Sequence, residues 1–197
     1  CSGSAIALVP ETETCDAILQ AWYPGERGGD AVADVLFGDY NPSGKLPITF
    51  YRSVDDLPDF LDYTMTNRTY RYFNGTPLWH FGYGLSYTSF TFGSPKYKDG
   101  KITVDVTNTG LRDGDETVQV YLRHTADTNG PKKTLRGFKR VSIKAGETKR
   151  VVIDMPKESF ETWDAATNTM RVIGGKYDVM VGNSSRDTDL KHIKVKL

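Results

Sequence analysis

The residues through which this chain of 197 amino acids could do chemistry are its carboxylates, three histidines and two cysteines. Hydrolysis by an activated serine needs a positioned histidine base and a sharp turn around the nucleophile. The chain has no Gly-x-Ser-x-Gly segment, and its histidines, His80, His124 and His192, are far from one another and from the cysteines. Metal catalysis needs His, Cys and carboxylate side chains at ligand spacing. We therefore expect neither a serine nucleophile nor a metal, and no cofactor.

Paired carboxylates can cleave glycosides, and the chain is rich in them. Two acids about 5 Å apart serve a retaining mechanism, and a wider pair serves an inverting one. The candidates in the first half lie in polar, turn-rich segments: Glu26, Asp30, Asp55, Asp56 and Asp59. Capping and ion pairing are the ordinary roles of acids in such segments. We therefore assign none of them as catalytic.

Composition narrows the class of partner. Lys and Arg number 25, Asp and Glu number 25, and no block of one sign occurs. This balance gives no electrostatic basis for binding nucleic acid, and no apolar stretch approaches the roughly 18 residues of a membrane span. Cys1 and Cys15, the only cysteines, allow one disulfide. We expect them instead to be buried free thiols.

The first 60 residues show α/β patterning. Apolar spacing predicts a strand at 4–9, helices at 15–22 and 30–37, and an edge strand at 45–50. Asp30 is expected to cap the second helix and Gly38 to end it. This is too little material to close a sheet with both faces covered. The pattern therefore predicts that residues 1–60 are the C-terminal remnant of an α/β sandwich domain.

From residue 86 onward the pattern becomes two-residue alternation interrupted by turn residues, which is typical of an antiparallel β-sandwich. Residues 61–85, which have no sustained period, are expected to form a connector and interdomain junction, and residues 86–197 an immunoglobulin-like or fibronectin-III-like sandwich. The predicted fold is thus mixed, a partial α/β segment followed by the sandwich. The candidate strands are 89–97, 101–108, 117–123, 135–144, 148–155, 170–173, 176–182 and 191–196.

Three segments carry a family resemblance. They are AWYPGERGGDAVADVLFGDYNPSGKLP at 21–47, PLWHFGYGLSYTSF at 77–90 and GGKYDVMVGNSS at 174–185. Together they resemble the C-terminal part of glycoside hydrolase family three, the family of β-xylosidases and β-glucosidases. The resemblance spans essentially the whole chain, and its third segment is similar to the closing hairpin of the family's fibronectin-III-like domain.

The resemblance implies a catalytic barrel, an α/β sandwich and a fibronectin-III-like domain in the parent protein. It implies a retaining mechanism with an aspartate nucleophile from the barrel and a glutamate acid/base from the α/β domain, both encoded before Cys1. The chain is then the mainly structural C-terminal fragment of a secreted or periplasmic exo-acting β-glycosidase that hydrolyses plant oligosaccharides. Its partners are the carbohydrate substrate and the upstream domains. The alternative is a non-catalytic carbohydrate-binding or adhesion module.

The connector carries the substrate-proximal candidates. Residues 68–73 resemble the xylosidase branch of the family, which favours xylosides over glucosides. Tyr63, Met65 and Arg68 could reach the sugar site from the connector, and interdomain packing explains them equally.

The junction at 77–90 is expected to clamp the sandwich to the α/β segment. Gly82 and Gly84 permit close backbone approach, and the neighbouring aromatic residues bury large surface: Phe81, Tyr83, Tyr87 and Phe90. A sugar-stacking platform is the alternative for this run. Trp163 and Tyr177 are expected in the sandwich core.

Overall fold

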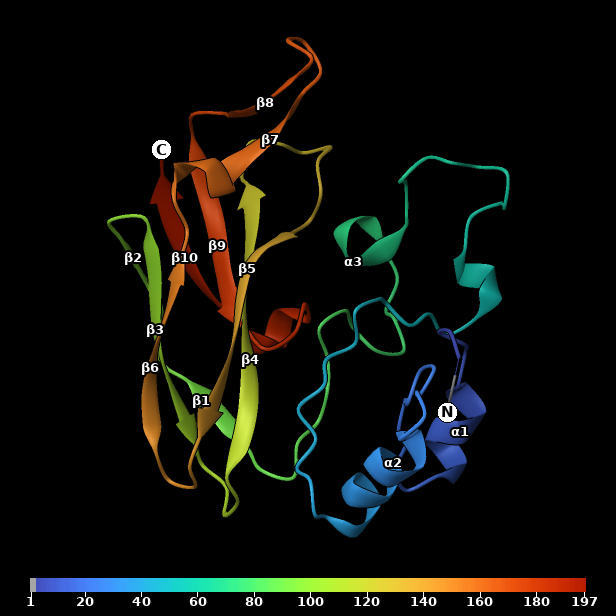
Figure 1. Cartoon of the computed structure of the whole chain (residues 1–197). Coiled ribbons are helices and arrows are strands. Elements are labelled where there is room, and N and C mark those ends of the chain that lie inside the picture. The colour runs from blue at the N-terminus through green and yellow to red at the C-terminus, as the bar shows by residue number, and fades with distance from the viewer. Residues whose placement is uncertain (1–2) are drawn as a thin grey trace.

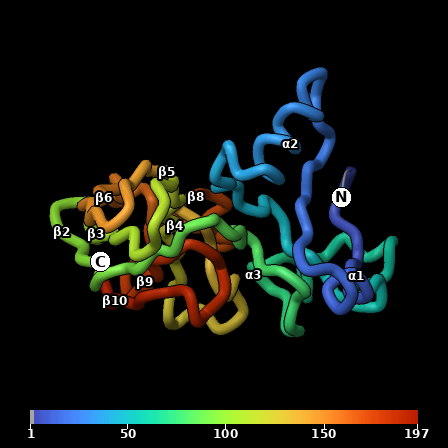
Figure 2. The backbone as a smooth tube through the Cα atoms, turned by 90° about the horizontal axis from the view of Figure 1, so that it is seen from below, coloured from blue at the N-terminus to red at the C-terminus, as the bar shows by residue number. Residues whose placement is uncertain are grey.

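The protein consists of an irregular N-terminal part beside a β-sandwich, as a computed structural model that describes residues 3–197 shows (Figure 1). Seen from below, the two parts form neighbouring lobes joined by the connector (Figure 2). The N-terminal part and the connector contain the helices α1 (Val9–Thr14), α2 (Gly28–Phe37) and α3 (Thr69–Tyr72) and the 3-10 turn η1 (Val54–Asp56). Within the described residues, no helix has the length and apolar character to cross a membrane.

The sandwich has the expected antiparallel architecture. One sheet places β3 between β6 on one side and β1 and β2 on the other, the second sheet has the order β10-β9-β4-β5, and β7 and β8 form a separate hairpin. The strands are β1 (Phe90–Phe92), β2 (Lys96–Lys98), β3 (Lys101–Asn108), β4 (Gly114–His124), β5 (Thr134–Ile143), β6 (Thr148–Asp154), β7 (Glu161–Asp164), β8 (Thr169–Val172), β9 (Lys176–Gly182) and β10 (Leu190–Lys196). Short 3-10 turns also occur at η2 (Lys157–Phe160) and η3 (Asp187–Asp189).

Two-residue alternation located most of these strands. β3 and β9 have the predicted bounds, and β4, β5, β6, β8 and β10 differ by at most three residues. The single strand expected at 89–97 is two, β1 and β2, which pair with the same edge of β3 on either side of Pro95. Proline has no N–H to donate to a ladder, so the pairing breaks there. β7 was not predicted.

The core lies between the two sheets and is made of alternating residues that are fully buried. β3 contributes Ile102, Val104 and Val106, and β4 contributes Val118 and Val120. Tyr177 is in this core as predicted, with its ring edge-on to Phe160. Trp163 is not, because it lies on the β7–β8 hairpin and is 56% exposed.

β4 is buried on both faces. Val118, Val120 and Leu122 face the inter-sheet core, while the intervening Gln119 and Tyr121 are buried on the outer face. A strand in a two-layer sandwich normally shows its second face to water. The connector therefore covers this outer face, and it is here that the two parts of the molecule meet.

The regular elements of the N-terminal part differ from the predictions. No strand forms at 3–8, α1 occupies Val9–Thr14, and the helix expected at 15–22 is absent. The segment 45–50 makes one isolated bridge, Phe50 to Trp79, instead of a strand. Short apolar runs do not distinguish helix from strand. The segment 45–50 does hydrogen-bond to residues 78–83, through Leu46 and Phe50, but these contacts do not form a continuous ladder. Cys15 is exposed, so the expectation of a buried thiol is wrong for this residue, and Cys1 lies outside the described residues.

α2 is the helix that the sequence located. It begins at Gly28, two residues before the predicted start, and ends as expected at Gly38, which has a φ of 83°. The predicted cap is wrong, because Arg27 is the N-cap and Asp30 lies in the first turn, paired with Arg27 at 3.0 Å. An acid in the first turn still stabilises a helix through its dipole.

Two adjacent valines on β6 give a matched test of the core. Val151 is 3% exposed and lies opposite Val104 of β3, whereas Val152 is 37% exposed. We expect Val151→Ala to lower the free energy of unfolding by about 2 kcal/mol, from lost burial plus the cavity left behind. Val152→Ala should cost less than about 1 kcal/mol. Urea unfolding measures both, and equal losses would contradict the assigned faces.

Candidate functional site

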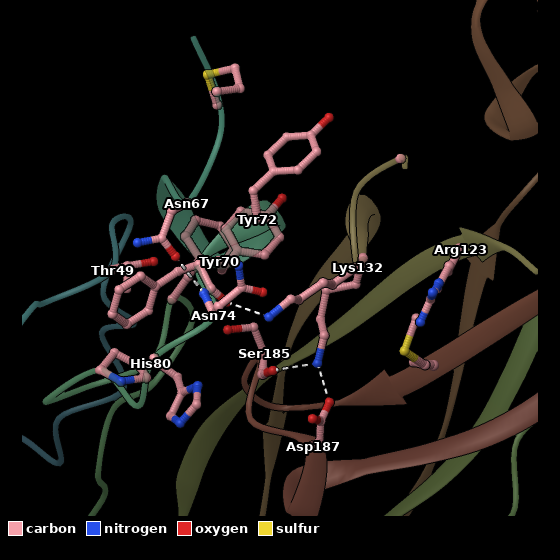
Figure 3. Close-up of a pocket in the computed structure, with 18 of the residues that line it drawn as sticks. Thr49, Asn67, Tyr70, Tyr72, Asn74, His80, Arg123, Lys132, Ser185 and Asp187 are labelled. Atoms are coloured by element: carbon pink, nitrogen blue, oxygen red, sulfur yellow. Dashed lines mark hydrogen bonds and ion pairs between the residues drawn. The ribbon is translucent and has the colours of Figure 1, made fainter. Parts of the chain in front are cut away.

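A cavity of about 840 Å³ lies where the connector meets the sandwich. Its walls come from the connector between Met65 and Phe81, from the segment between Arg123 and Lys133 that ends β4 and leads to β5, and from β9, β10 and the turn between them. Figure 3 shows side chains from these three regions, with Arg123 on the strands at the right and Asn67, Asn74 and Lys132 closer together. The volume of the cavity is far above the 40 Å³ of a second recess, which lies between the end of β4 and β7.

Two lysines fix the walls of the cavity. Lys133 is buried and donates to the carbonyl of Ser185 at 2.8 Å and to the carboxylate of Asp187. The hydrogen bond from Lys133 holds the pKa of Asp187 below its ordinary value. Lys132 donates through Nζ to the carbonyl of Phe73, and its backbone N–H donates to the carbonyl of Arg71 at 2.7 Å. The β4–β5 loop is therefore tied to α3 and to the β9–β10 turn.

His80 is a connector residue of the cavity wall, and its surroundings lower the pKa of its imidazole. Burial lowers the pKa of His80 below its ordinary value, and the charges of Arg186 and Lys133 lower it further. At neutral pH the imidazole is therefore mainly uncharged. A neutral ring accepts a hydrogen bond at one nitrogen and donates at the other.

The substrate-proximal candidates from the sequence do not converge on the cavity. Met65 lines it, whereas Tyr63 is 85% exposed and is not among the lining residues. Arg68 points into its own loop, where its guanidinium donates to the carbonyls of Thr64, at 2.9 Å, and Asp62. The structure thus gives Arg68 a role in holding the connector loop, and contact of these residues with sugar stays a prediction.

Three of the acidic residues considered as catalytic candidates have local structural contacts. Asp56 forms a capping box with Ser53 at η1, and Asp59 accepts the N–H of Leu61 at 2.8 Å. Asp30 is paired with Arg27, as described above. Among residues 3–197 no group of three or more His, Cys, Asp or Glu is arranged to hold a metal ion.

The aromatic residues of the junction clamp the connector to the outer face of the second sheet. Tyr70 and Phe81 stack with ring centroids 4.2 Å apart, and both meet Tyr121 of β4 edge-on. Tyr83 lies beneath the guanidinium of Arg186, and Tyr87 donates its hydroxyl to the carbonyl of Val35 in α2 at 2.6 Å. Phe81, Tyr83 and Tyr87 thus make contacts of the predicted clamp, although Tyr87 is 44% exposed, whereas Phe90 packs against the sandwich core as part of β1.

The glycines of the junction are required by close packing. Gly82 has a φ of 79°, and a Cβ there would lie 2.1 Å from Oε1 of Gln119. At Gly84 a Cβ would lie 2.1 Å from the carbonyl oxygen of Gly44. No other residue fits either position without moving its neighbour, as the sequence predicted.

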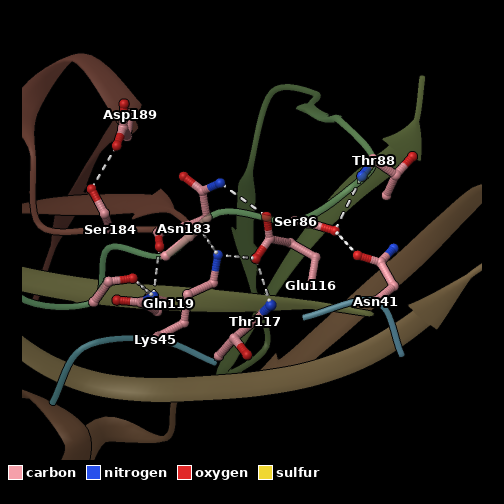
Figure 4. A network of polar contacts seen from close by, with 12 residues as sticks. Asn41, Lys45, Ser86, Thr88, Glu116, Thr117, Gln119, Asn183, Ser184 and Asp189 are labelled. Carbon is pink, nitrogen blue, oxygen red and sulfur yellow. Dashed lines mark hydrogen bonds and ion pairs between the residues drawn. The ribbon is translucent and has the colours of Figure 1, made fainter. Parts of the chain in front are cut away.

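A buried polar network completes the junction (Figure 4). Lys45 Nζ lies 2.8 Å from Glu116 Oε1 and donates to the carbonyl of Gly84 at 3.0 Å. The other oxygen of Glu116 accepts from Asn183 at 2.9 Å. Gln119 donates to the carbonyls of Gly82 and Asn183, and Asn41 joins the same junction by accepting from Ser86 at 2.9 Å. The ammonium of Lys45 and the carboxylate of Glu116 are thus hydrogen-bonded to further groups as well as to each other.

Sequence reasoning missed the charged residues of the cavity. Lys133 and Asp187 lie 54 residues apart, and Arg123 is the last residue but one of β4. None of the three was assigned a role from the sequence, because polar residues in loops have no periodicity that would reveal their partners. The Asn-Gly pairs at 74–75 and 129–130 were the available signal, because both turns line the cavity.

Comparison with known proteins covers nearly the whole chain. A family model described as "Glycosyl hydrolase family 3 C-terminal domain" matches residues 1–87, and a "Fibronectin type III-like domain" matches residues 116–185. A "Xylan 1,4-beta-xylosidase" of Xylanibacter ruminicola is 57% identical over 100% of this chain and 24% of its own length. A "Periplasmic beta-glucosidase" of Salmonella typhimurium is 44% identical over 93% of this chain and 27% of its own length.

The solved structures agree. A Bifidobacterium adolescentis GH3 β-glucosidase superposes with a TM-score of 0.89 at 34% identity, over 100% of this chain and 32% of that protein. A β-glucosidase from Kluyveromyces marxianus gives a TM-score of 0.88 at 33% identity, over 100% of this chain and 26% of that protein. The chain spans about a quarter of the length of the curated relatives. Its two matched domains, its junction and its fold together show that the chain belongs to glycoside hydrolase family three.

Proposed function

We propose that this chain is the C-terminal, mainly structural portion of a retaining exo-acting β-glycosidase that hydrolyses plant-derived oligosaccharides. The observation that carries the proposal is the pairing of a family 3 C-terminal domain with a fibronectin type III-like domain. The nucleophile and the acid/base then belong to the parent enzyme. In this proposal residues 1–60 complete an α/β domain, 61–85 form the junction, and 86–197 form the sandwich.

Xylosides are the favoured substrate and an extracytoplasmic compartment the favoured location. The relative with 57% identity is named a xylan 1,4-beta-xylosidase, and the one with 44% identity a beta-glucosidase. The name of the Salmonella relative includes the word periplasmic, which supports a secreted or periplasmic parent.

This chain exposes an apolar surface that fits the remaining domains of the parent enzyme as its partner. Of 19 exposed large hydrophobic residues, 14 lie between residues 6 and 87. They include Leu36 and Phe37 at the end of α2, Phe60 and Tyr63. Exposed apolar surface concentrated on one part marks an interaction surface, and the chain spans about a quarter of its relatives.

The isolated chain should be inactive. We expect no saturable hydrolysis of nitrophenyl β-xyloside or β-glucoside by the pure chain, because the proposal places both carboxylates that a glycosidase needs in the rest of the parent enzyme. Co-expression with the portion of the Xylanibacter ruminicola enzyme that it does not match should restore turnover. The control is that portion expressed alone, and saturable turnover by this chain without a partner would refute the proposal.

The uncovered apolar surface should cause self-association. Light scattering of the pure chain is expected to show oligomers or aggregates at micromolar concentration, because the exposed residues of the N-terminal part bury one another. Co-expression with the complementary portion should abolish this association. A monodisperse monomer of the chain alone would contradict the assignment of this surface as a covered one.

The ion pair between Lys45 and Glu116 should be essential to the junction. Their side chains are 12% and 3% exposed, so Glu116→Gln leaves a buried ammonium without an opposite charge, and we expect a loss of about 3 kcal/mol or more in the free energy of unfolding. Asp30→Asn, which breaks the exposed pair with Arg27, should change it little.

The double variant Lys45→Met, Glu116→Gln separates the cost of an unpaired buried charge from the cost of altered packing. It removes both charges, so most of the lost stability should return. Urea unfolding followed by tryptophan fluorescence measures each variant. A double variant as unstable as Glu116→Gln alone would show that packing, and not the unpaired charge, carries the effect.

A further inference from the structure

We propose that the cavity between the connector and the sandwich binds an oligosaccharide that carries a carboxylate, such as a uronate-substituted xylo-oligosaccharide, with Arg123 as the anchor of the carboxylate. This inference rests on the proposed function and goes beyond it, because it assigns this chain a ligand of its own. It is independent of catalysis, since the site lies wholly within the described residues.

Within residues 3–197, Arg123 is the lysine or arginine of the cavity wall whose side chain makes neither a hydrogen bond nor an ion pair. Arg123 and Asp178 lie directly opposite each other on β4 and β9, and such neighbours commonly pair. The carboxylate of Asp178 is instead held on the other side by β10, with Lys194 at 3.0 Å and His192 at 3.1 Å. Within residues 3–197 the guanidinium of Arg123 therefore has no ion pair.

The lysines of the lining have hydrogen-bond partners, although only Lys133 is in an ion pair within residues 3–197. Lys133 is paired with Asp187, and Lys132 donates to a backbone carbonyl of the connector. The imidazole of His80 is mainly neutral because its pKa is lowered. Arg123 is thus, in the described part of the chain, the cation of the lining without a partner of either kind, visible at the sandwich side of the cavity in Figure 3. A guanidinium presents a planar fork of N–H donors that matches a carboxylate.

The neutral groups of the lining suit a polyhydroxylated ligand. The hydroxyls of Thr49 and Ser185 belong to residues only 7% and 3% exposed, and neither hydroxyl has a hydrogen-bond partner in the described part of the chain. Leaving such a group unpaired costs roughly 1–3 kcal/mol. Both residues belong to the cavity lining, and a sugar hydroxyl that reached either group would satisfy it.

An amide and an aromatic ring of the cavity lining also suit a sugar ligand. The side-chain amide of Asn129 lines the cavity and makes no hydrogen bond to any residue from 3 to 197. Tyr72 is half-buried in the same wall, and an aromatic ring with a polar edge suits contact with a sugar. The volume of about 840 Å³ is within the range of ligand pockets, about 300–1,000 Å³.

The test is calorimetric titration of the purified chain with two probes: xylo-oligosaccharides that carry glucuronic acid and the same oligosaccharides without it. We expect the acidic probe to bind roughly tenfold more tightly, the effect of one charge-assisted hydrogen-bonding contact. Added salt should weaken its binding and leave the neutral probe unaffected. Arg123→Gln should lower the affinity for the acidic probe to the affinity for the neutral probe.

Arg52→Gln is the matched control, because Arg52 is also exposed and does not line the cavity. It should leave both affinities unchanged, and thermal melting should show that both variants stay folded. Equal affinities for the two probes, no binding at millimolar concentration, or an unchanged preference in Arg123→Gln would each overturn the proposal. These outcomes do not depend on turnover, so they are distinct from a failure of the proposed function.

Discussion

The buried ion pair of Lys45 and Glu116 holds the N-terminal part of the molecule to the β-sandwich. Taking two charges out of water is costly unless they face each other and their remaining atoms are hydrogen-bonded. Both conditions are met, through Gly84, Thr117 and Asn183. The pair therefore fixes the register between residue 45 and the start of β4. Because the N-terminal part has few regular hydrogen bonds of its own, its position depends on this contact together with the exposed hydrogen bonds that Asn41 and Arg112 make across the same junction.

The double burial of β4 follows from the same junction. A strand whose outer face met water would carry solvated side chains there, but Gln119 and Tyr121 are covered by residues 70–82. Gln119 uses its amide to satisfy two backbone carbonyls, and the hydroxyl of Tyr121 donates to Gln119 in turn. Burial raises the pKa of Tyr121 well above its ordinary value, so the hydroxyl keeps its proton and remains a donor.

How far the sequence predicts the structure depends on where each residue finds its partner. The first and last residues of β3 and β9 were predicted correctly, because every second residue of each strand is buried in the core and this alternation is visible in the local sequence. The segments 4–9, 15–22 and 45–50 were wrong because the structure of a short apolar run depends on a distant neighbour. Gly82 and Gly84 were predicted as close-approach positions, while their partners, Gln119 and Gly44, are visible only in the fold.

The same reasoning separates the residues of the site that were predicted from those that were not. Arg68 was a reasonable substrate candidate from its place in the connector, yet its nearest acceptors are carbonyls of its own loop, and it is used there. Arg123 lies at the end of an alternating strand and drew no attention. Its availability arises from a competition that only the sheet reveals, because Asp178, its cross-strand neighbour, is held by β10. A charged side chain stays available for a ligand when its cross-strand neighbour forms an ion pair with another residue. Local sequence does not show such a pairing, because it depends on the order of the strands in the sheet.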